Sequence, residues 1–237
     1  MRIYQSVIEM VKEVERDLFE MGIRYQTETV QDQSVYGDPN FQTIELFGYG
    51  YTLTDYSDLE NIISYLKLNE AWLREEDLER LFGSSIGGPE NLNPGLAWEK
   101  NIEFWENFLR DKKFSYSYAE RWQEQLGYII NELKLRPNTR QAVMTMYDRH
   151  QDMMNWGGRD RVPCSLTYQF MIRNQKLHLI YNQRSCDFMK FFGSDVYLTI
   201  NLLKYIARAL ELEPGHFIHF LGSLHAFAKD LEKRNIF

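Results

Sequence analysis

An α+β fold is the class that the sequence predicts, because long stretches of the chain carry strand signals and others carry helix signals. Residues 43–53 alternate apolar and polar side chains as a half-buried strand does, and residues 165–181 do so on either side of a tight turn. Residues 3–18 and 196–212 space their apolar side chains three and four apart, which is typical of amphipathic helices. We therefore expect a sheet with helices packed on it.

The length and composition of the chain indicate one folded domain over residues 1–237. A hydrophobic content of 44% and an aromatic content of 15% exclude a disordered chain, and no apolar run approaches the length of a membrane span. Acids and lysines interrupt the apolar residues of the first helix, unlike the continuous apolar core of a signal peptide. We expect a soluble, cytoplasmic protein with no membrane partner.

The charge of the chain argues against one class of partner. Its formal net charge is −7, and no basic run offers the positive surface that nucleic acid polymers need. A nucleotide monomer is compatible with this charge, because it needs only a few local arginines. The two cysteines, Cys164 and Cys186, could in principle form a disulfide, whereas a reducing cytoplasm would keep Cys164 free.

The first third of the chain alternates loop, strand and helix signals. Residues 27–42 are polar and rich in turn formers, and residues 43–53 form the first clear strand. Two short helices are predicted at 58–66 and 69–82. The second of them has a strongly acidic surface, which carries Glu75, Glu76 and Glu79.

A glycine- and proline-rich segment and an aromatic segment come next. Residues 83–95 contain four glycines and two prolines, without the strand, lysine and helix of a phosphate-binding loop. We interpret them as a flexible connection. A helical stretch at 98–109 follows, and its Trp105 and Phe108 suit either a core stripe or a ligand site.

The middle of the chain leads from a helix into the hairpin. Tyr118 stands at the start of a helix predicted over 122–133. A turn at 136–140 connects this helix to an alternating segment, 141–147, that is typical of a strand. Residues 151–161 form a polar loop, which we place at the surface.

The hairpin at residues 165–181 brings reactive side chains together. A tight connection at 174–176 predicts antiparallel pairing, which places Cys164 beside Arg184 and Ser185 at the end of the partner strand. A nearby guanidinium lowers the pKa of a thiol, and it also suits a phosphate. A cysteine that begins an apolar strand is nevertheless more often a buried structural residue than a nucleophile. Both roles are open for Cys164 on the hairpin alone.

The last part of the chain is predicted to contain a buried helix, a strand and a final helix. The apolar spacing of residues 196–212 predicts a central buried helix, which Pro214-Gly215 ends. A strand follows at 217–221, and the final helix begins near His225. We expect no metal site, because no recognised ligand spacing is present in the three histidines of this part, His216, His219 and His225.

Four separate blocks of the sequence resemble the thymidylate synthase family. They are Pro163-Cys164, Gln169-Phe170, the run Gln183-Arg184-Ser185-Cys186-Asp187, and Gly222-Ser223-Leu224-His225. The resemblance covers most of residues 135–227 and the N-terminal half only loosely. It implies a thymidylate synthase-like α+β fold, with a large mixed sheet packed against helices, and a back-to-back homodimer.

Within the family, three positions are more similar to the deoxycytidylate hydroxymethylases than to the synthases. Ser165 follows the nucleophile where synthases usually have histidine, Asp195 replaces an asparagine, and residues 222–225 depart from Gly-Asp-x-His. The resemblance implies transfer of a one-carbon unit from 5,10-methylenetetrahydrofolate to dCMP, giving 5-hydroxymethyl-dCMP. The alternatives are a methyltransferase of the thymidylate synthase type acting on dCMP or dUMP, a CMP hydroxymethylase, and a non-catalytic nucleotide-binding protein.

The resemblance also assigns roles to individual residues. It makes Cys164 the nucleophile that adds to C6 of the pyrimidine, with Tyr118 and Asp187 as catalytic partners. Either Glu76 or Glu79 is the glutamate that organises water and protons. The residues that it places around the nucleotide are Gln183, Arg184, Ser185, Asp195, His225 and Arg140. Those that it places against the folate are Trp105 and Phe108.

The chain departs from the family pattern at three places. Arg140 matches the first of two arginines that reach the nucleotide phosphate across a dimer interface, but Gln141 replaces the second, and Arg149 is a candidate to compensate. Phe227 replaces a tyrosine that binds the sugar. The sequence ends at Phe237, before the tail that closes over the folate in the family, so we expect weaker closure and easier entry of water.

Asp195 is expected to select the base. A carboxylate accepts a hydrogen bond from the amino group of cytosine, whereas it would face the carbonyl of uracil with opposed lone pairs. The alternative role for Asp195 is to cap the helix that begins at Val196. Both roles can hold, because a carboxylate has two oxygens.

Overall fold

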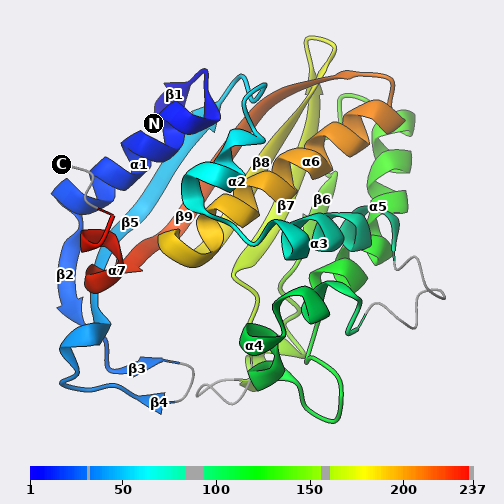
Figure 1. The fold of residues 1–237 in the computed structure, drawn as a ribbon. Coiled ribbons are helices and arrows are strands. Elements are labelled where there is room, and N and C mark those ends of the chain that lie inside the picture. Colours follow the sequence, from blue (N-terminus) through cyan, green and yellow to red (C-terminus); the bar gives the residue numbers. More distant parts are fainter. Residues whose placement is uncertain (31–32, 84–92, 156–160, 235–237) are drawn as a thin grey trace.

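A mixed sheet of seven strands organises the fold (Figure 1). The structure is a computed structural model, and it describes residues 1–30, 33–83, 93–155 and 161–234. The strands of the sheet are β1 (Arg2–Tyr4), β2 (Ile23–Gln26), β5 (Gln42–Leu53), β6 (Val143–Thr145), β7 (Ser165–Arg173), β8 (Lys176–Asp187) and β9 (Glu213–Phe227). A separate pair consists of β3 (Thr29–Val30) and β4 (Gln33–Ser34).

The order of the strands is β1-β5-β9-β8-β7-β6, and β2 pairs with the first residues of β5. The pairs β1–β5 and β8–β9 are parallel, and the other neighbours are antiparallel. Parallel neighbours need a long crossover, which the chain between β8 and β9 supplies with a helix. The predicted α+β class with a large mixed sheet is confirmed.

The predicted hairpin is confirmed as β7 and β8. Its tight turn is formed by Asn174 and Gln175, whose φ angles are +51° and +58°. Two successive left-handed residues form the turn whose twist matches that of the flanking strands. At the other end of the hairpin, the backbone N–H of Arg184 donates to the carbonyl of Cys164 at 2.8 Å. The pairing therefore brings Cys164 next to Arg184, as expected.

The helices lie over one face of the sheet, with α6 running diagonally across it (Figure 1). They are α1 (Val7–Met21), α2 (Asn61–Leu66), α3 (Glu70–Phe82), α4 (Ile102–Trp105), α5 (Tyr118–Leu135), α6 (Gly193–Ala209) and α7 (Ala228–Glu232). Side chains cap three of them at the N-terminus, and such caps stabilise a helix by about 1 kcal/mol each. The capping residues are Ser6, Asn69 and Ser117. No helix in the described part of the chain is long and apolar enough to cross a bilayer.

The core lies between α6 and the sheet. Val196, Leu198, Ile200, Leu203 and Ile206 of α6 are fully buried, and α6 packs on β8 and β9. Each such side chain contributes roughly 1.5–3 kcal/mol when it leaves water. The central buried helix that the sequence predicts is therefore present.

Large apolar side chains are exposed on the opposite face of the sheet. Phe47 of β5 is 64% exposed, and Phe220 of β9 is 42% exposed. His219 and Leu221, on either side of Phe220, are buried, so alternation directs Phe220 away from the helices. Val143 of β6 is also 38% exposed. This face remains uncovered in a single chain, over the residues that the structure describes.

The C-terminal elements differ from the predicted ones. The helix α6 begins at Gly193 and ends at Ala209, three residues earlier at each end than the spacing of 196–212 predicted. The strand β9 is longer than the predicted 217–221, because it follows the long strand β8 in register from Lys176↔Glu213 to Asp187↔His225. Pro214 is accommodated near the beginning of this strand, and His225 lies in it instead of starting a helix.

Smaller corrections concern the N-terminal half. Ile3 belongs to β1 and is 68% exposed, so it is not part of the first helix. The predicted helix at 98–109 is broken into the 3₁₀ turn Ala97–Asn101, the short α4 and the 3₁₀ turn Glu106–Phe108. The strand predicted at 141–147 is confined to β6. The connection predicted at 83–95 lies mostly outside the described residues.

Candidate active site

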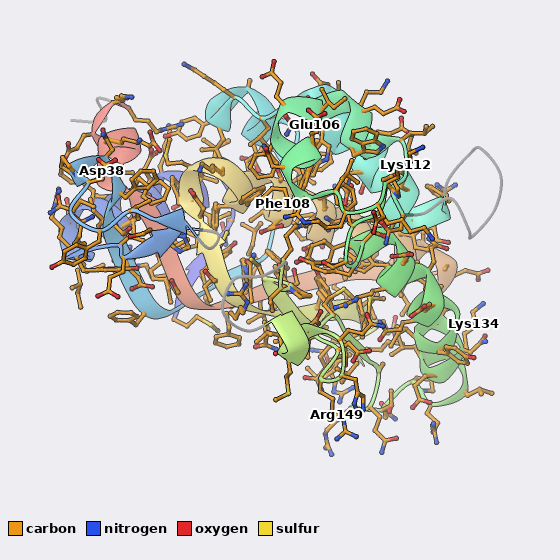
Figure 2. The ribbon with its side chains drawn as sticks, turned by 90° about the horizontal axis from the view of Figure 1, so that it is seen from below. Asp38, Glu106, Phe108, Lys112, Lys134 and Arg149 are labelled. Carbon is orange, nitrogen blue, oxygen red and sulfur yellow. The ribbon has the colours of Figure 1, made fainter. Side chains whose placement is uncertain are left out.

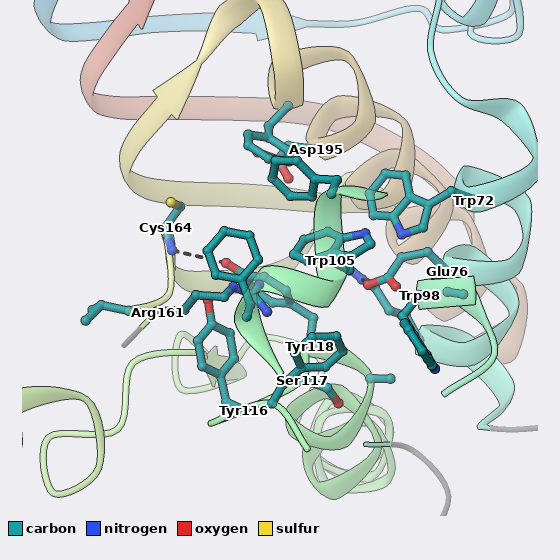
Figure 3. Close-up of a pocket in the computed structure, with 18 of the residues that line it drawn as sticks. Trp72, Glu76, Trp98, Trp105, Tyr116, Ser117, Tyr118, Arg161, Cys164 and Asp195 are labelled. Carbon is teal, nitrogen blue, oxygen red and sulfur yellow. Dashed lines mark hydrogen bonds and ion pairs between the residues drawn. The ribbon is translucent and has the colours of Figure 1, made fainter. Parts of the chain in front are cut away.

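A cavity of about 640 Å³ opens between α3, the segment 95–118 and the ends of β7 and β8 (Figure 3). Most of the candidate residues line it. They are Glu76, Glu79, Trp105, Phe108, Tyr118, Cys164, Gln183, Arg184, Ser185, Asp187 and Asp195. Residues more than a hundred positions apart in the sequence thus meet at one site.

Two candidates, Arg140 and His225, do not line the cavity of the single chain. Arg140 is exposed just before β6, where its backbone carbonyl accepts from Gln169. Arg149, the candidate to compensate for Gln141, is also exposed and projects from the edge of the molecule (Figure 2). His225 is half-buried on β9, opposite Asp187 in the strand register.

We call one side of the cavity the polar wall, which consists of Cys164, Gln183, Arg184, Asp187 and Asp195. Cys164 directly precedes β7, and its sulfur lies 3.8 Å from Nη2 of Arg184. The same guanidinium donates from Nε to the carbonyl of Pro163 at 2.8 Å and from Nη2 to the carbonyl of Val162 at 2.9 Å. Arg184 therefore fixes the backbone that leads into Cys164.

The pKa of the Cys164 thiol is raised, contrary to the expectation from its arginine neighbour. Burial is the largest cause, because it disfavours the thiolate. Arg184 and Arg161 oppose this effect, and Asp195 adds to it. Burial therefore explains why the pKa differs from the expected one. The position of a residue in a hairpin does not reveal how deeply it is buried. A raised pKa means that the thiol of Cys164 is protonated at neutral pH.

Tyr118 connects the start of α5 to the cysteine. Its hydroxyl oxygen accepts from the backbone N–H of Cys164 at 3.1 Å and from that of Ser165 at 3.2 Å. Burial raises its pKa well above the ordinary value, so the phenol keeps its proton. Ser117 caps the helix, and Tyr118 is its first residue. The tyrosine is thus both a helix start and a residue of the site.

The two candidate glutamates have different partners. Glu79 is buried, and its Oε1 accepts from the backbone N–H groups of Leu96 and Ala97, the latter at 3.1 Å. Burial and the nearby Glu76 raise the pKa of Glu79 to about 7. Glu76 instead pairs with Arg80, whose Nε lies 2.7 Å from Oε1. Glu79 holds the chain beyond the glycine-rich segment, whereas Glu76 belongs to a charge pair in the cavity wall.

Asp195 lies within α6 and does not cap it. The residue at the N-cap position is Phe192, so the capping role expected for Asp195 is wrong. Its Oδ2 accepts from Nε2 of Gln183 at 2.6 Å, and the thiol of Cys186 lies 3.7 Å away. Burial raises the pKa of Asp195 to about 6. At neutral pH it is a buried carboxylate held by an amide.

A chain of buried hydrogen bonds fixes the orientation of that amide. Oε1 of Gln183 lies 3.0 Å from Nε2 of His219, and Nδ1 of His219 lies 2.9 Å from the hydroxyl of Tyr51. Burial lowers the pKa of His219 to about 3, so the imidazole is neutral. Because Gln183 donates to Asp195, its oxygen accepts from His219, and Tyr51 then donates to the other ring nitrogen. The polar wall is therefore preorganised.

Asp187 ends the polar wall by capping a turn. Its Oδ1 accepts from the backbone N–H groups of Met189 at 2.9 Å and Lys190 at 3.2 Å, at the start of the π-helical turn Phe188–Phe192. Burial raises the pKa of Asp187, although Lys190 and His225 oppose the shift. This carboxylate holds the turn that carries the chain from β8 into α6.

The other side of the cavity is an aromatic wall, which consists of Trp72, Phe104, Trp105, Phe108 and Phe114. Their rings meet edge to face or tilted, and the distances from the centroid of Trp105 range from 4.7 Å to Phe104 to 6.0 Å to the other three. Trp105 and Phe108 are half-buried and line the cavity, so they do not form a closed core stripe. Among the described residues, the buried indole N–H of Trp105 has no hydrogen-bond acceptor.

Two arginines in the cavity were not identified from the sequence. The Cζ atom of Arg161 lies 4.6 Å from the Trp105 ring and 4.9 Å from the Tyr116 ring. Arg80 is buried on α3 and also lines the cavity. Their sequence signals were weak: Arg80 follows Glu76 by one helical turn, and Arg161 precedes Cys164 in the polar loop. In the described ranges, no three His, Cys, Asp or Glu side chains gather as metal ligands.

Comparisons with known proteins show the family of the chain. The sequence model of the thymidylate synthase family matches residues 45–236. A Methanocaldococcus jannaschii protein, provisionally named a thymidylate synthase, is 34% identical over 133 residues, which cover 56% of this chain and 59% of that protein. A deoxyuridylate hydroxymethyltransferase of Bacillus phage SP01 is 33% identical over 108 residues, which cover 45% of this chain and 28% of that protein.

A third relative, from Methanosarcina mazei, is also provisionally named a thymidylate synthase. It is 31% identical over 123 residues, which cover 49% of this chain and 55% of that protein. The matched region thus spans less than two thirds of the length of each of these relatives. The match of the family model covers most of the chain, including every residue of both walls. The chain belongs to the thymidylate synthase family.

Proposed function

We propose that this protein transfers a one-carbon unit from 5,10-methylenetetrahydrofolate to C5 of dCMP and releases 5-hydroxymethyl-dCMP. The observation that carries the proposal is the meeting of Cys164, Tyr118, Arg184 and Asp195 in one cavity of a thymidylate synthase family member. The name of the phage relative supports a hydroxymethyl product. Its uracil nucleotide makes dUMP the main competing substrate.

Cys164 is the proposed nucleophile. C5 of a pyrimidine is a poor nucleophile, and addition of sulfur to C6 turns the ring into an enamine that can react at C5. The thiol has to lose its proton as it adds, and Arg184, 3.8 Å from the sulfur, favours the charged form. Loss of the C5 proton with release of tetrahydrofolate leaves a methylene group on C5, and addition of water to this carbon with expulsion of sulfur then restores the aromatic ring.

Arg184 and Ser185 are the proposed phosphate ligands. A guanidinium has five N–H donors, and Arg184 uses one on Pro163 and one on Val162. The remaining donors suit phosphate oxygens, which arginine binds in pairs. Arg140 is proposed to reach the phosphate of a partner subunit, because it is exposed and outside the cavity of its own chain.

Asp195 and Gln183 are proposed to bind the base. Because Oδ2 of Asp195 accepts from Gln183, we assign Oδ1 to the amino group of cytosine. The bonds of Gln183 to His219 and Asp195 keep its amide from turning, so the wall presents one fixed pattern of donors and acceptors. A rigid carboxylate acceptor favours cytosine over uracil.

The aromatic wall fits the folate. Trp105 and Phe108 offer flat apolar surface, and the indole N–H of Trp105, which has no acceptor among the described residues, offers a donor to a ring heteroatom of a ligand. When bound, 5,10-methylenetetrahydrofolate supplies a carbon at the oxidation level of formaldehyde. Tyr118 and Glu76 line the cavity (Figure 3), and we propose that they order the water that ends as the hydroxyl of the product.

We further propose that the protein works as a back-to-back homodimer in the cytoplasm. The exposed Phe47, Phe220 and Val143 on the uncovered sheet face support the dimer, since large apolar surface on a sheet favours association. A dimer would also bring Arg140 to a nucleotide site from the other chain. Both cysteines are free, as a reducing compartment would keep them.

Mass spectrometry of the nucleotide product tests the activity. The protein is incubated with 5,10-methylenetetrahydrofolate and, separately, dCMP, dUMP or CMP. We expect a mass gain of CH₂O on dCMP, with tetrahydrofolate as the second product. A gain of CH₂ with formation of dihydrofolate would instead establish a methyltransferase. Tight nucleotide binding without any new product, equal in wild type and Cys164→Ser, would establish a binding protein.

A further inference from the structure

Arg80 is a buried cation in the cavity wall for which the reaction outlined above has no role. Its residue is 4% exposed on α3, and its Nε donates to Oε1 of Glu76 at 2.7 Å. Burial is the largest single influence and opposes the charge of Arg80, but Glu76, Tyr168 and Tyr118 together favour it, so the pKa of Arg80 is raised. A buried charge is costly to keep, and such pairs concentrate at functional sites.

Arg80 also fixes aromatic side chains of α5. Its Cζ atom lies 4.4 Å from the ring centroid of Tyr118 and 5.2 Å from that of Trp122. Its backbone carbonyl accepts from Nε2 of Gln123 at 2.7 Å, which ties the same turn of α3 to α5. A planar guanidinium can stack on rings and pair with a carboxylate at once, which an ammonium group cannot do equally well.

Tyr118 connects Arg80 to Cys164, the proposed nucleophile. The ring rests on Arg80, and its hydroxyl oxygen accepts from the backbone N–H groups of Cys164 and Ser165. A shift of the ring would therefore move the backbone that carries the thiol. Misplacement of a reacting group by about 1 Å can cost a hundredfold in rate.

We propose that Arg80 is a positioning residue of the active site, which holds Tyr118 against the Cys164 backbone and holds Glu76 at the cavity wall. Its effect on the rate rests on the proposed function, because Tyr118 and Glu76 act only if that chemistry occurs. The pairing also distinguishes the two glutamates. Glu79 holds the backbone of residues 96–97, which leaves Glu76 as the carboxylate that Arg80 presents to the cavity.

The charge of Arg80 also reaches Asp195. Burial raises the pKa of that carboxyl, and Arg80 is one of the groups that limit the rise. The groups around Asp195 that bear on its charge are Gln183, Cys186 and Tyr181 on β8, Cys164 directly before β7, Tyr168 on β7, Tyr118 on α5, Tyr51 on β5, and Glu76 and Arg80 on α3. Arg80 is the cation in this set.

A kinetic comparison with a matched arginine tests the proposal. Arg74 lies on the same helix, pairs with Glu60 at 2.6 Å and sits 5.5 Å from the Tyr197 ring, but it does not line the cavity. We expect Arg80→Met to lower kcat about a hundredfold while the Kd for dCMP changes less than about threefold. Arg80→Lys should recover part of the rate, and Arg74→Met should leave kcat unchanged.

The loss of kcat in each variant decides whether Arg80 has this positioning role. An unchanged kcat in Arg80→Met, or an equal loss in Arg74→Met, would overturn the positioning role. If Arg80→Met does not fold, Arg80→Lys carries the test, with an expected loss of about tenfold in kcat at unchanged dCMP affinity. A double variant with Glu76→Gln should lose no more than the worse single variant, because paired residues act as a unit.

A measurement without turnover separates this proposal from the proposed function. The ¹³C-carboxyl resonance of Asp195 is titrated by NMR in the wild type, Arg80→Met or Arg80→Lys, and Arg74→Met. We expect the midpoint to rise by about half a unit or more in Arg80→Met, to change less in Arg80→Lys, and to stay constant in Arg74→Met. A constant midpoint in Arg80→Met would show that the charge of Arg80 does not act on Asp195. A wild type that converts no nucleotide would refute the activity, while this titration would still decide whether Arg80 acts on the site.

Discussion

The two walls of the cavity are built in different ways. Most of the polar wall stands on the sheet at the paired ends of β7 and β8, and the buried bonds from Tyr51 through Gln183 orient Asp195 on α6. The aromatic wall stands mostly on the short turns between α3 and α5, with Trp72 of α3 at its side, and it is held by ring contacts around Trp105. Ring contacts tolerate small shifts, whereas a hydrogen-bond chain does not.

This difference suits the two ligands that we propose. A nucleotide has to be placed with its C6 against a sulfur, and a preorganised wall does this without further ordering. A folate has to enter, give up its carbon and leave, which a more adaptable wall allows. The comparison predicts that changes in the polar wall alter rate and base choice, whereas changes in the aromatic wall alter the affinity for folate.

The largest effect is expected from Cys164→Ser. A hydroxyl is far less acidic than a thiol, so it should not add to C6, and turnover should fall by at least about 10⁴-fold. The rest of the polar wall is intact in this variant, so the Kd for dCMP should stay within about tenfold of the wild type. Release of tritium from [5-³H]dCMP measures the first chemical steps. Undiminished release in the variant would remove Cys164 from the mechanism.

The polar wall was largely predictable from sequence, and the reason is geometric. Residues 183–187 are consecutive on one strand, so placing one of them places the others. Asp195 lines the cavity, but the capping role expected for it is wrong, because the π-helical turn Phe188–Phe192 leads α6 to begin at Gly193. Periodicity does not reveal such a turn.

The aromatic wall and the two hidden arginines were less predictable. Trp105 and Phe108 lie on a segment expected to be one helix, and the structure breaks it into turns. Arg80 and Arg161 act through stacking on rings from distant segments, which spacing along the chain does not show. The pKa of Cys164 was misjudged for a related reason, since burial depends on the whole fold.

The second largest effect is expected from Asp195→Asn, which changes the polar wall without changing its shape. An amide can turn its N–H₂ group toward the carbonyl of uracil, so the preference for dCMP over dUMP should fall by one to several orders of magnitude. The ratio of kcat/KM for the two nucleotides measures it. If the ratio does not change and only the thermal stability falls, Asp195 has a structural role.

A smaller effect is expected from Trp105→Leu in the aromatic wall. Loss of a stacking ring should raise the KM for 5,10-methylenetetrahydrofolate about tenfold, corresponding to roughly 1.4 kcal/mol, with little change in the Kd for dCMP. Phe82→Leu is the matched control, because Phe82 also contacts a ring, that of Tyr205, and is 65% exposed outside the cavity. A parallel loss of nucleotide affinity in Trp105→Leu would show that the two walls are not separate.

The smallest expected effect is a pH dependence of stability, which Asp195 of the polar wall causes. Burial raises the pKa of Asp195 to about 6 in the folded state, so the folded protein holds this proton more tightly than the unfolded chain does. The stabilisation is complete below the unfolded pKa, about 4, and is lost as the pH rises to the folded pKa. Between pH 5 and pH 8, Asp195 should therefore lower the free energy of unfolding by about 1 kcal/mol.

Urea unfolding at pH 5 and pH 8 measures this change in the wild type and in Asp195→Asn. The variant cannot ionise at this position, so its stability should fall about 1 kcal/mol less over the same interval. Glu79, whose pKa burial raises to about 7, contributes in the same direction in both proteins and cancels in the comparison. Leu81, buried on the same helix, provides a control: Leu81→Val should lower stability at both pH values equally, because it removes no titrating group. Identical pH slopes in wild type and Asp195→Asn would mean that water or a relaxed side chain solvates Asp195, and the polar wall would then be as adaptable as the aromatic one.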